Sequence, residues 1–479
     1  MAPGNVVLEW NNIYLDLVRK IGGAPGPLSR IGALMHLAMY EAVTRLTATS
    51  PYPRHLRDSD IKDPKTNQVV MPGNAVANTT AAYAACHILT KAVEVYVSAS
   101  KRAQGEVLNP FDPFQVRPGA DSSSPALEVH TTDANAQASE AYGKAIAYAL
   151  LAKYNPAEGL SPAVTLKPDQ KGEWRDTGSG PALTPNWGEV DLFLLPPPVQ
   201  DYLPTVIPND LNNYEDLLES SMYAMQLAEV KLLGEANSTA RTREQTEIAI
   251  FWANDLNGTS KPPGQLYTIT QTVAQQQGTL VDVQNSSGNP TGNGLLETAR
   301  LFAMVGTAMV NASIVAWKAK YFWPNKNQPL RLWRPETAIQ RANEDGNPST
   351  AADATWQPLS AMLSGMRFSP NFPAYVSGHS TFAAAHAAAM RAFFGRDTIA
   401  FTATTEDPHA LRDENGIRRT RRFSSFTQAA LENGRSRVYL GVHYQFDANG
   451  GYEIGTLVGE HTADLFEATV QTPAPSVMA

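Results

Sequence analysis

The stretch Phe372-Pro-Ala-Tyr-Val-Ser-Gly-His379 leads into an alanine-rich run, Ser380 to Met390, whose composition predicts a helix. Ser377, Gly378 and His379 would then lie at the N-terminus of that helix, where unpaired backbone N–H groups and the helix dipole favour an anion. The glycine allows the backbone to approach closely, the serine adds a hydroxyl donor, and the histidine can exchange a proton near neutral pH. The stretch therefore indicates an oxyanion site.

A second stretch, Arg437-Val-Tyr-Leu-Gly-Val-His443, places a fixed positive charge and an imidazole six residues apart. From a turn and the element beside it, both groups can converge on one anion. Asp447 follows His443 by four residues and could accept a hydrogen bond that fixes the imidazole tautomer. Ser-Gly-His alone is a weak signal, but together with this second stretch it is a strong one.

The bulk composition is that of a soluble globular protein. The chain has 479 residues, a length that suffices for the cores of two or three domains. Of its residues 43% are hydrophobic and 18% are charged, which is ordinary for a globular protein. The net charge of -8 argues against a nucleic-acid partner, so the positive charge of an anion site must be gathered locally. No apolar run approaches the length of roughly 18 residues that a membrane-spanning helix needs, so none is expected.

The single cysteine and the start of the chain bear on the compartment. Cys86 excludes an intrachain disulfide and a cysteine-based metal cluster, and its alanine-rich surroundings predict a small buried residue. Met1-Ala-Pro-Gly-Asn5 is not a signal peptide. The compartment therefore stays open between an intracellular protein and one that is exported with its leader removed.

Helical periodicity dominates the chain, and no strand-rich region stands out. We predict an all-α protein of two packed helical bundles. Residues 1–205 would form an N-terminal bundle with long Pro-rich loops, and residues 206–479 a C-terminal bundle that carries the oxyanion site. The charged segment 395–422 is predicted to be a loop. The apolar patterns predict helices over 28–43, 76–98, 134–153, 214–233, 243–252, 294–322, 380–390, 424–434 and 446–468.

Three cations are candidates for holding an oxyanion, namely Lys320, Arg334 and Arg437. Arginine offers a planar fork that suits a tetrahedral oxyanion, and lysine a compact point charge. Taken singly, each is more often a solvated surface residue. Trp333 flanks Arg334, however, and Lys320 follows Trp317 by three residues on an apolar helix. Both surroundings favour burial, and a buried cation needs a partner.

Several other groups have two interpretations. His379 either caps its helix or acts as a general acid/base beside a bound oxyanion, and His443 could be structural. Asp255 is either a loop residue, which the sequence alone favours, or the carboxylate that holds a buried arginine. The run Arg418 to Arg422 predicts a solvated surface or the rim of the site. Three histidines on apolar helical faces are predicted to be core residues: His36, His87 and His386.

These motifs resemble the vanadium-dependent haloperoxidases, whose superfamily includes the type 2 phosphatidic acid phosphatases and bacterial acid phosphatases. The superfamily pattern is Lys-x6-Arg-Pro, then Pro-Ser-Gly-His, then Ser-Arg-x5-His-x3-Asp, and the stretch Ser436 to Asp447 matches its last part in full. The resemblance covers roughly residues 220–470 and looks closest to the fungal chloroperoxidase branch. Four flanking sequences carry that likeness: Phe251-Trp-Ala-Asn-Asp255, Trp317-Lys-Ala-Lys320, Trp333-Arg-Pro335 and Phe372-Pro-Ala-Tyr375.

The resemblance implies a vanadate cofactor. His443 would bond the vanadium through a ring nitrogen, and vanadate would act as a Lewis acid without a change of oxidation state. The groups that would hold the vanadate oxygens are Lys320, Arg334, Ser377, the backbone N–H of Gly378, and Arg437.

The resemblance also implies the roles around the cofactor. His379 would deprotonate bound hydrogen peroxide, and Asp255 would pair with Arg437. Trp317 and Phe372 would line the halide position. Phe372 stands where the family's bromoperoxidases tend to carry histidine, so oxidation of both chloride and bromide is expected.

Two departures from the family pattern stand out. Val376 replaces the proline before Ser-Gly-His, which loosens the turn slightly and removes no ligand. Lys320 and Arg334 are fourteen residues apart where the pattern has seven, which an insertion around 324–330 would explain. Lys320 is preferred because its flanking sequence matches, and Lys326 is the fallback. If the insertion bends the lysine away, halide oxidation should fall more than oxyanion binding.

Three functions fit these residues. The first is a haloperoxidase that uses hydrogen peroxide and chloride or bromide to make hypohalous acid, which then halogenates a small organic substrate. The second is a soluble acid phosphatase, because phosphate competes for the same site as an analogue of vanadate and His443 could serve as nucleophile. The third is a non-catalytic oxyanion-binding relative. No nucleic-acid or membrane partner is expected, and the protein could be a monomer or a homodimer.

Overall fold

The computed structural model of the protein describes residues 5–100, 134–160, 170–178, 180–196, 198–204, 213–279, 294–324, 329–364 and 369–467, together with residues 166 and 208. Helices dominate these residues, and the strands found among them are β1 (Phe401–Ala403) and β2 (Arg421–Phe423), which pair antiparallel. The expected all-α class is confirmed.

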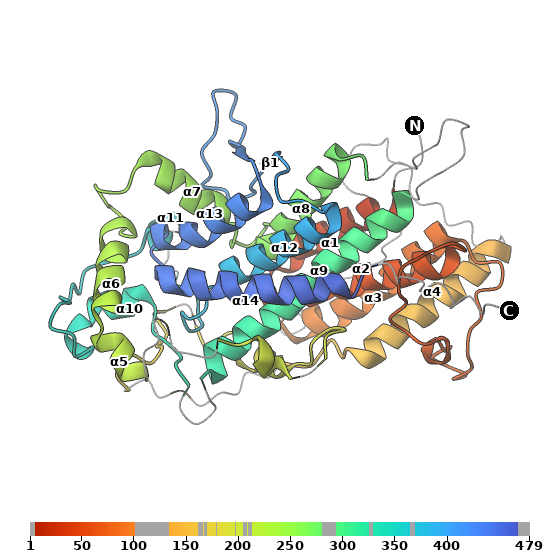
Figure 1. Ribbon diagram of the computed structural model, residues 1–479, viewed down its shortest axis with the longest axis horizontal. Helices are drawn as coiled ribbons and strands as arrows, with labels where there is room; N and C mark the ends of the chain where they lie inside the picture. The colour runs from red at the N-terminus through yellow and green to blue at the C-terminus, as the bar shows by residue number, and fades with distance from the viewer. Residues whose placement is uncertain are drawn as a thin grey trace, which may run out of the picture.

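Helix α9 (Gly294–Phe322) runs through the middle of the molecule (Figure 1). It packs against α2 (Pro25–Leu46) from the first half of the chain and against α12 (Gly378–Phe394) and α14 (Gln445–Asp464) from the second. Its length and hydropathy would allow it to cross a membrane, but 94% of its most apolar window is buried inside the protein. A helix that is apolar on all sides and covered by neighbours is a core helix.

The first half of the chain forms helices around α2. Helix α1 (Val6–Ile21) packs on α2, α3, α8 and α9, and helices α3 (Ala77–Ser100) and α4 (Ala134–Lys153) pack on each other and on α2. One hydrophobic core runs from α1 through α9 to the end of α14. The boundary predicted near residue 205 falls on a segment outside the described residues, so the division into 1–205 and 206–479 stays a prediction.

The close packing of α12 on α14 rests on glycines in α14. A Cβ atom on Gly455 would lie 2.3 Å from the backbone oxygen of Thr381, and one on Gly459 would lie 2.7 Å from the Cβ of Ala388. With hydrogen at these positions the two helices approach each other closely. This contact sets the N-terminus of α12 beside the first turn of α14, where the backbone N–H of Ser377 donates to the carbonyl oxygen of Asp447 at 2.9 Å.

The remaining elements of the second half surround these helix ends. Helix α13 (Phe426–Tyr439) packs on both α12 and α14, and α7 (Arg243–Ala253) packs on α13. The other helices are α5 (Tyr214–Glu219), α6 (Ser221–Leu233), α8 (Lys261–Gln276), α10 (Pro335–Gln340) and α11 (Leu359–Ser364). Single 3-10 turns lie at Asp58–Asp60, Pro185–Glu189, Val199–Tyr202 and Ala342–Glu344.

The predicted helices are confirmed with three differences. The helix predicted over 214–233 divides at Ser220, whose hydroxyl accepts the backbone N–H of Tyr223 at 3.1 Å and so caps α6. Helices α1, α8 and α11 were not predicted, and α8 begins with prolines in its first turn, which a helix tolerates there. The segment 395–422 contains the β1–β2 pair and is not entirely a loop.

Candidate oxyanion site

The N-terminus of α12 has the geometry that the sequence predicts. Ser377 is the N-cap residue, and Gly378 and His379 occupy the first turn. The Ser377 hydroxyl accepts the backbone N–H of Ser380 at 3.4 Å, and the Ser377 side chain is fully buried. The backbone N–H groups of a first helical turn have no partner within the helix, and Gly378 and His379 line the same cavity as His443.

His443 is held in one tautomer by its two neighbours. Its Nδ1 lies 2.8 Å from the carboxylate of Asp447, and its Nε2 lies 2.9 Å from Nη1 of Arg334. Because a guanidinium only donates, Nε2 must accept and Nδ1 must carry the proton. Burial, reinforced by Arg334 and Lys320, lowers the pKa of His443 well below 6.5. His443 therefore presents a neutral imidazole with an Nε2 lone pair, held by Asp447 as the sequence suggested.

Arg334 and Arg437 are fully buried cations whose donors are not all used. Arg334 donates to the carbonyl oxygens of Phe372 and Val442 at 2.8 and 2.9 Å, but its Nη2 has no partner among the described residues. Arg437 donates from Nη2 to Asp255 at 3.1 Å, whereas its Nε and Nη1 have no protein acceptor in the same part of the chain. Burial lowers the pKa of both guanidinium groups, that of Arg334 to about 9. Unpaired buried N–H donors are costly unless a ligand accepts from them.

Asp255 links Arg437 to His379. Asp255 follows the end of α7 in a loop, and its carboxylate contacts both Arg437 and, at 3.7 Å, the Nε2 of His379. The two interpretations of Asp255 are therefore compatible. His379 Nε2 lies 3.2 Å from the carbonyl oxygen of Ala253 and donates to it, which leaves Nδ1 as the acceptor. Burial, together with Arg437, lowers the pKa of His379 to about 4.

Lys320 is fully buried, but its ammonium group is already occupied. Its Nζ donates to the carbonyl oxygens of Pro373 and Ala374 at 2.8 and 3.0 Å and also to that of Val376. An ammonium has three donors, so this lysine is fully used by the loop that leads into α12. Burial lowers the pKa of Lys320 well below 10.5, and Arg334 lowers it further. Lys326, the fallback, lies outside the described residues.

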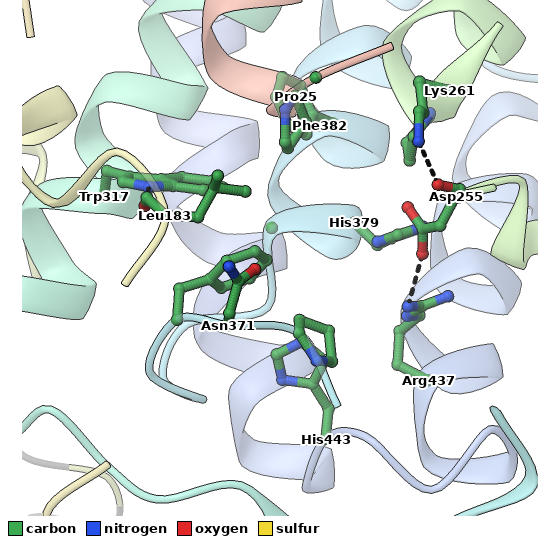
Figure 2. A pocket seen from close by; sticks show the side chains of 15 residues that line it. Pro25, Leu183, Asp255, Lys261, Trp317, Asn371, His379, Phe382, Arg437 and His443 are labelled. Atoms are coloured by element: carbon green, nitrogen blue, oxygen red, sulfur yellow. Dashed lines mark hydrogen bonds and ion pairs between the residues drawn. The ribbon is translucent and has the colours of Figure 1, made fainter. Parts of the chain in front are cut away.

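A cavity of about 140 Å³ connects these groups (Figure 2). His379, Arg437 and His443 line it together with the rings of Trp317 and Phe372, whose centroids are 5.0 Å apart. The two aromatic rings thus face the same cavity as His443, which is the arrangement that a halide position between them requires.

Lys261 is a cavity residue that the sequence analysis missed. It lies on the same wall as Asp255, only 8% exposed, and its Nζ donates to the Asp255 backbone oxygen. The segment around it is rich in Gly, Pro and Asn, a composition that indicates only a break between helices. The missed signal was a charged residue directly before Pro262 and Pro263 at the start of a helix.

The other groups considered in the sequence analysis lie elsewhere. Arg419, Arg421 and Arg422 line a separate cavity with α7, where Arg419 pairs with Glu247 at 3.0 Å. Cys86 is buried as predicted. The three histidines predicted to be core residues do not line this cavity. His36 and His386 are buried and bond to Asn11 and Thr270, whereas His87 is only half-buried and packs near Tyr148.

These residues fit a tetrahedral oxyanion. The cavity wall brings together the neutral imidazole of His443, the guanidinium of Arg437 and the N-terminus of α12, and Arg334 lies directly behind His443. Three guanidinium nitrogen atoms of Arg334 and Arg437 are buried without an acceptor among the described residues. Arginine forks and helix N-termini both recognise oxyanions. Within the described residues, no group of three or more His, Cys, Asp or Glu side chains is placed to hold a metal cation.

Comparison with known proteins shows what part of the chain is similar to a characterised family. Residues 300–472 match the model of the second helical-bundle domain of VCPO, the vanadium chloroperoxidase. A vanadium chloroperoxidase of Curvularia inaequalis is 32% identical over an alignment of 262 residues, which covers 48% of this chain and 40% of that protein. The match thus spans less than half the length of that relative.

Solved structures with the same fold cover nearly the whole chain. A bacterial vanadium-dependent iodoperoxidase has a TM-score of 0.66 at 22% identity and matches 97% of this chain and 98% of its own. A bacterial vanadium-dependent chloroperoxidase has a TM-score of 0.56 at 16% identity, with coverages of 94% and 95%. These two structures are of bacterial proteins, and the fungal branch stays a prediction. Residues 300–472 match the second helical-bundle domain of vanadium chloroperoxidase, and the chain as a whole has the fold of the vanadium-dependent iodoperoxidase and chloroperoxidase structures.

Proposed function

We propose that the protein is a vanadate-dependent haloperoxidase. The observation that carries this proposal is the set of buried, unpartnered N–H donors on Arg334 and Arg437 around the neutral imidazole of His443. Such donors destabilise a protein that has no ligand for them, and a vanadate ion would satisfy them together. Nε2 of His443 is the atom that would bond the vanadium. In this structure its lone pair accepts a hydrogen bond from Arg334.

The oxygens of vanadate would be held by groups on three elements. The side chains of Arg334 and Arg437 donate from one side, and Ser377 and the Gly378 N–H donate from the start of α12. Lys320 shapes the same loop from behind through its three carbonyl contacts. Vanadate, when bound, supplies a Lewis acid that activates peroxide without changing its own oxidation state.

The protein's own residues would supply the proton transfer and the halide position. Nδ1 of His379 accepts a proton from hydrogen peroxide, because the ring is neutral above a pKa of about 4 and its Nε2 is committed to Ala253. Trp317 and Phe372 offer an apolar place for a halide beside the cations. The overall reaction takes hydrogen peroxide, a halide ion and one proton to hypohalous acid and water. We propose chloride and bromide as the halides.

The test is an activity assay on protein freed of oxyanions. Orthovanadate is added first, then hydrogen peroxide with bromide or chloride, and halogenation of a β-diketone dye is followed with and without phosphate. We expect halogenation that requires vanadate and that phosphate blocks. No halide oxidation, together with a vanadate-inhibited phosphatase activity, would contradict the proposal.

Two buried histidines provide a matched pair of variants. His443→Ala should abolish vanadate-dependent halogenation, whereas His386→Ala, which removes an equally buried histidine bonded to Thr270, should retain it. Equal losses in the two variants would mean that His443 has only a structural role.

A further inference from the structure

The outer part of the cavity is built from segments far apart in the chain. Pro25 comes from the start of α2, Leu183 from the loop before the 3-10 turn at 185–189, Pro262 from α8 and Pro370 from the loop that leads to Phe372. These side chains and the rings of Trp317 and Phe372 are apolar. Because the oxyanion beside His443 and Arg437 takes part of this cavity of about 140 Å³, nothing larger than a single small ring fits against the outer part.

Lys261 is a cation that lines this cavity beside Asp255. Figure 2 shows its side chain lying above Asp255, with Nζ directed at the Asp255 backbone. Nζ also donates to Asn257 at 3.3 Å, and among the described residues these are its acceptors. The third N–H of the ammonium group is left for a ligand. Asp255 is also the partner of Arg437, so Lys261 supports the oxyanion site indirectly through this loop.

The position of Lys261 is fixed by its surroundings. Its backbone φ of 61° is a left-handed conformation that a lysine rarely adopts. The backbone N–H of the preceding Ser260 donates to Glu406 at 2.7 Å, and Arg19 of α1 binds the same carboxylate at 2.7 Å. The amide of Asn254 donates to the Lys261 backbone oxygen at 3.2 Å. A charge held this firmly at the edge of an apolar cavity can orient a ligand.

We propose that Lys261 and the apolar wall of the cavity bind the organic substrate, and that this substrate is a small aromatic compound with a negatively charged group. The ring would lie against the aromatic and proline side chains, and the anionic group would pair with the Lys261 ammonium. Halogenation then occurs next to the oxidant, where a ring C–H bond is replaced by a carbon–halogen bond and the hydroxyl of hypohalous acid leaves with the ring proton as water. This inference rests on the proposed function.

The test compares two probes of the same size. 4-Hydroxybenzoate carries a carboxylate, and 4-hydroxybenzamide is its neutral counterpart. The kcat/KM for bromination of each probe is measured with the vanadate-loaded protein, and the value for the carboxylate is divided by the value for the amide. The same ratio is measured for bromination by reagent hypobromite without protein. The first ratio is then divided by the second. This quotient removes the intrinsic reactivity of the probes. We expect a preference for the carboxylate of about tenfold, the size of one hydrogen bond to a charged group.

Variants of Lys261 separate its charge from its structural contacts. Lys261→Gln keeps a donor for the Asp255 backbone but removes the charge, so the preference should fall to near one. Lys261→Arg keeps the charge and should retain most of the preference. Lys91→Gln, at an exposed position on α3, makes the same change in net charge and should retain the full preference. Because each value is a ratio within one protein, a general loss of oxidant production cancels.

Iodide oxidation separates this inference from the proposed function, because triiodide forms without any organic substrate. If vanadate-loaded protein makes no triiodide, the proposed function fails and this inference fails with it. If triiodide forms but the quotient is one in the wild-type protein, the oxidant acts in free solution and the substrate site is wrong. A preference that persists in Lys261→Gln would also overturn the role of Lys261.

Discussion

Arg45 in the N-terminal half and Arg437 in the C-terminal half are both almost fully buried, yet they are used differently. Arg45 pairs with Glu41 at 2.9 Å and also contacts Asp58 and the backbone of Leu56, so each of its nitrogen atoms has an acceptor. Arg437 has one carboxylate partner, Asp255, and two nitrogen atoms with no acceptor in the part of the chain that the structure describes. The same residue type thus completes a core in one region and leaves donors facing a cavity in the other.

The difference separates structural from functional burial of charge. A buried cation with all donors satisfied holds elements together, and removing its partner is costly. A buried cation with donors left over lowers stability until a ligand arrives, so its position is explained by binding. Lys320 is an intermediate case, because it lies at the site but all its donors are satisfied by the loop before α12.

The largest effect should follow from removing the imidazole at the centre of the site. His443→Ala takes away the nitrogen atom that would be the vanadium ligand, so vanadate affinity and halide oxidation should fall by roughly a thousandfold or more. Vanadate titration and triiodide formation measure the two losses. A variant that keeps vanadate affinity within a few-fold of wild type would show that the oxyanion is held elsewhere.

Arg45→Met should act on stability and not on the site. It leaves the buried carboxylate of Glu41 without its cation, which costs about 3–5 kcal/mol in the free energy of unfolding. Denaturant unfolding measures this loss, and phosphate binding to the folded variant should be unchanged. Weaker phosphate binding would mean that the two halves of the protein are energetically coupled, and the contrast drawn here would not hold.

Arg437→Met should show the reverse pattern. It removes donors that serve the oxyanion, so vanadate and phosphate affinity should fall by about a hundredfold, as expected for two charge-assisted hydrogen bonds. The free energy of unfolding without oxyanion should change less than in Arg45→Met, because fewer protein contacts are lost. Calorimetric titration with phosphate and denaturant unfolding test both parts, and a larger loss of stability than in Arg45→Met would contradict them.

The smallest effect is a shift in the protonation of His379. Burial beside Arg437 lowers the pKa of His379 from the usual 6.5 to about 4. The ring is therefore neutral above about pH 4. A bound oxyanion adds negative charge and favours the imidazolium, so phosphate should raise the pKa of His379 by about one unit, or ~1.4 kcal/mol. By linkage, phosphate affinity then falls as the pH rises through this range.

Nuclear magnetic resonance of the imidazole protons measures this shift, and His386 is the internal control. It is buried with a pKa of about 3, bonds to Thr270, and does not line the cavity. Its resonance should titrate identically with and without phosphate. A shift of His386 as large as that of His379 would indicate a global change of structure, and no shift of His379 would place the oxyanion away from it.

The sequence predicted those features of the fold and the site that local patterns encode. The bounds of α9 agree with the apolar run over 294–322, and the start of α12 follows from Ser377 and Gly378. The histidine–aspartate contact of His443 follows from a spacing of four residues across a helix start. Each of these depends on neighbours in the chain.

Features that depend on distant contacts could not be predicted. That Lys320 satisfies three carbonyls more than fifty positions away is a matter of tertiary packing, as the sequence separations of 53, 54 and 56 residues show. Lys261 joins the cavity because Glu406 and Arg19 hold its loop, and neither is near it in the chain. The β1–β2 pair forms from two strands of three residues, which is too short for alternation to stand out.

The central claim is tested most directly by a calorimetric titration with vanadate. The titration is made on the oxyanion-free wild-type protein and on Arg437→Met. The account predicts one vanadate per chain, displaced by phosphate, with an affinity that falls about a hundredfold in the variant. Equal vanadate affinity in the two proteins would contradict it, because the unpaired donors of Arg437 would then have no ligand.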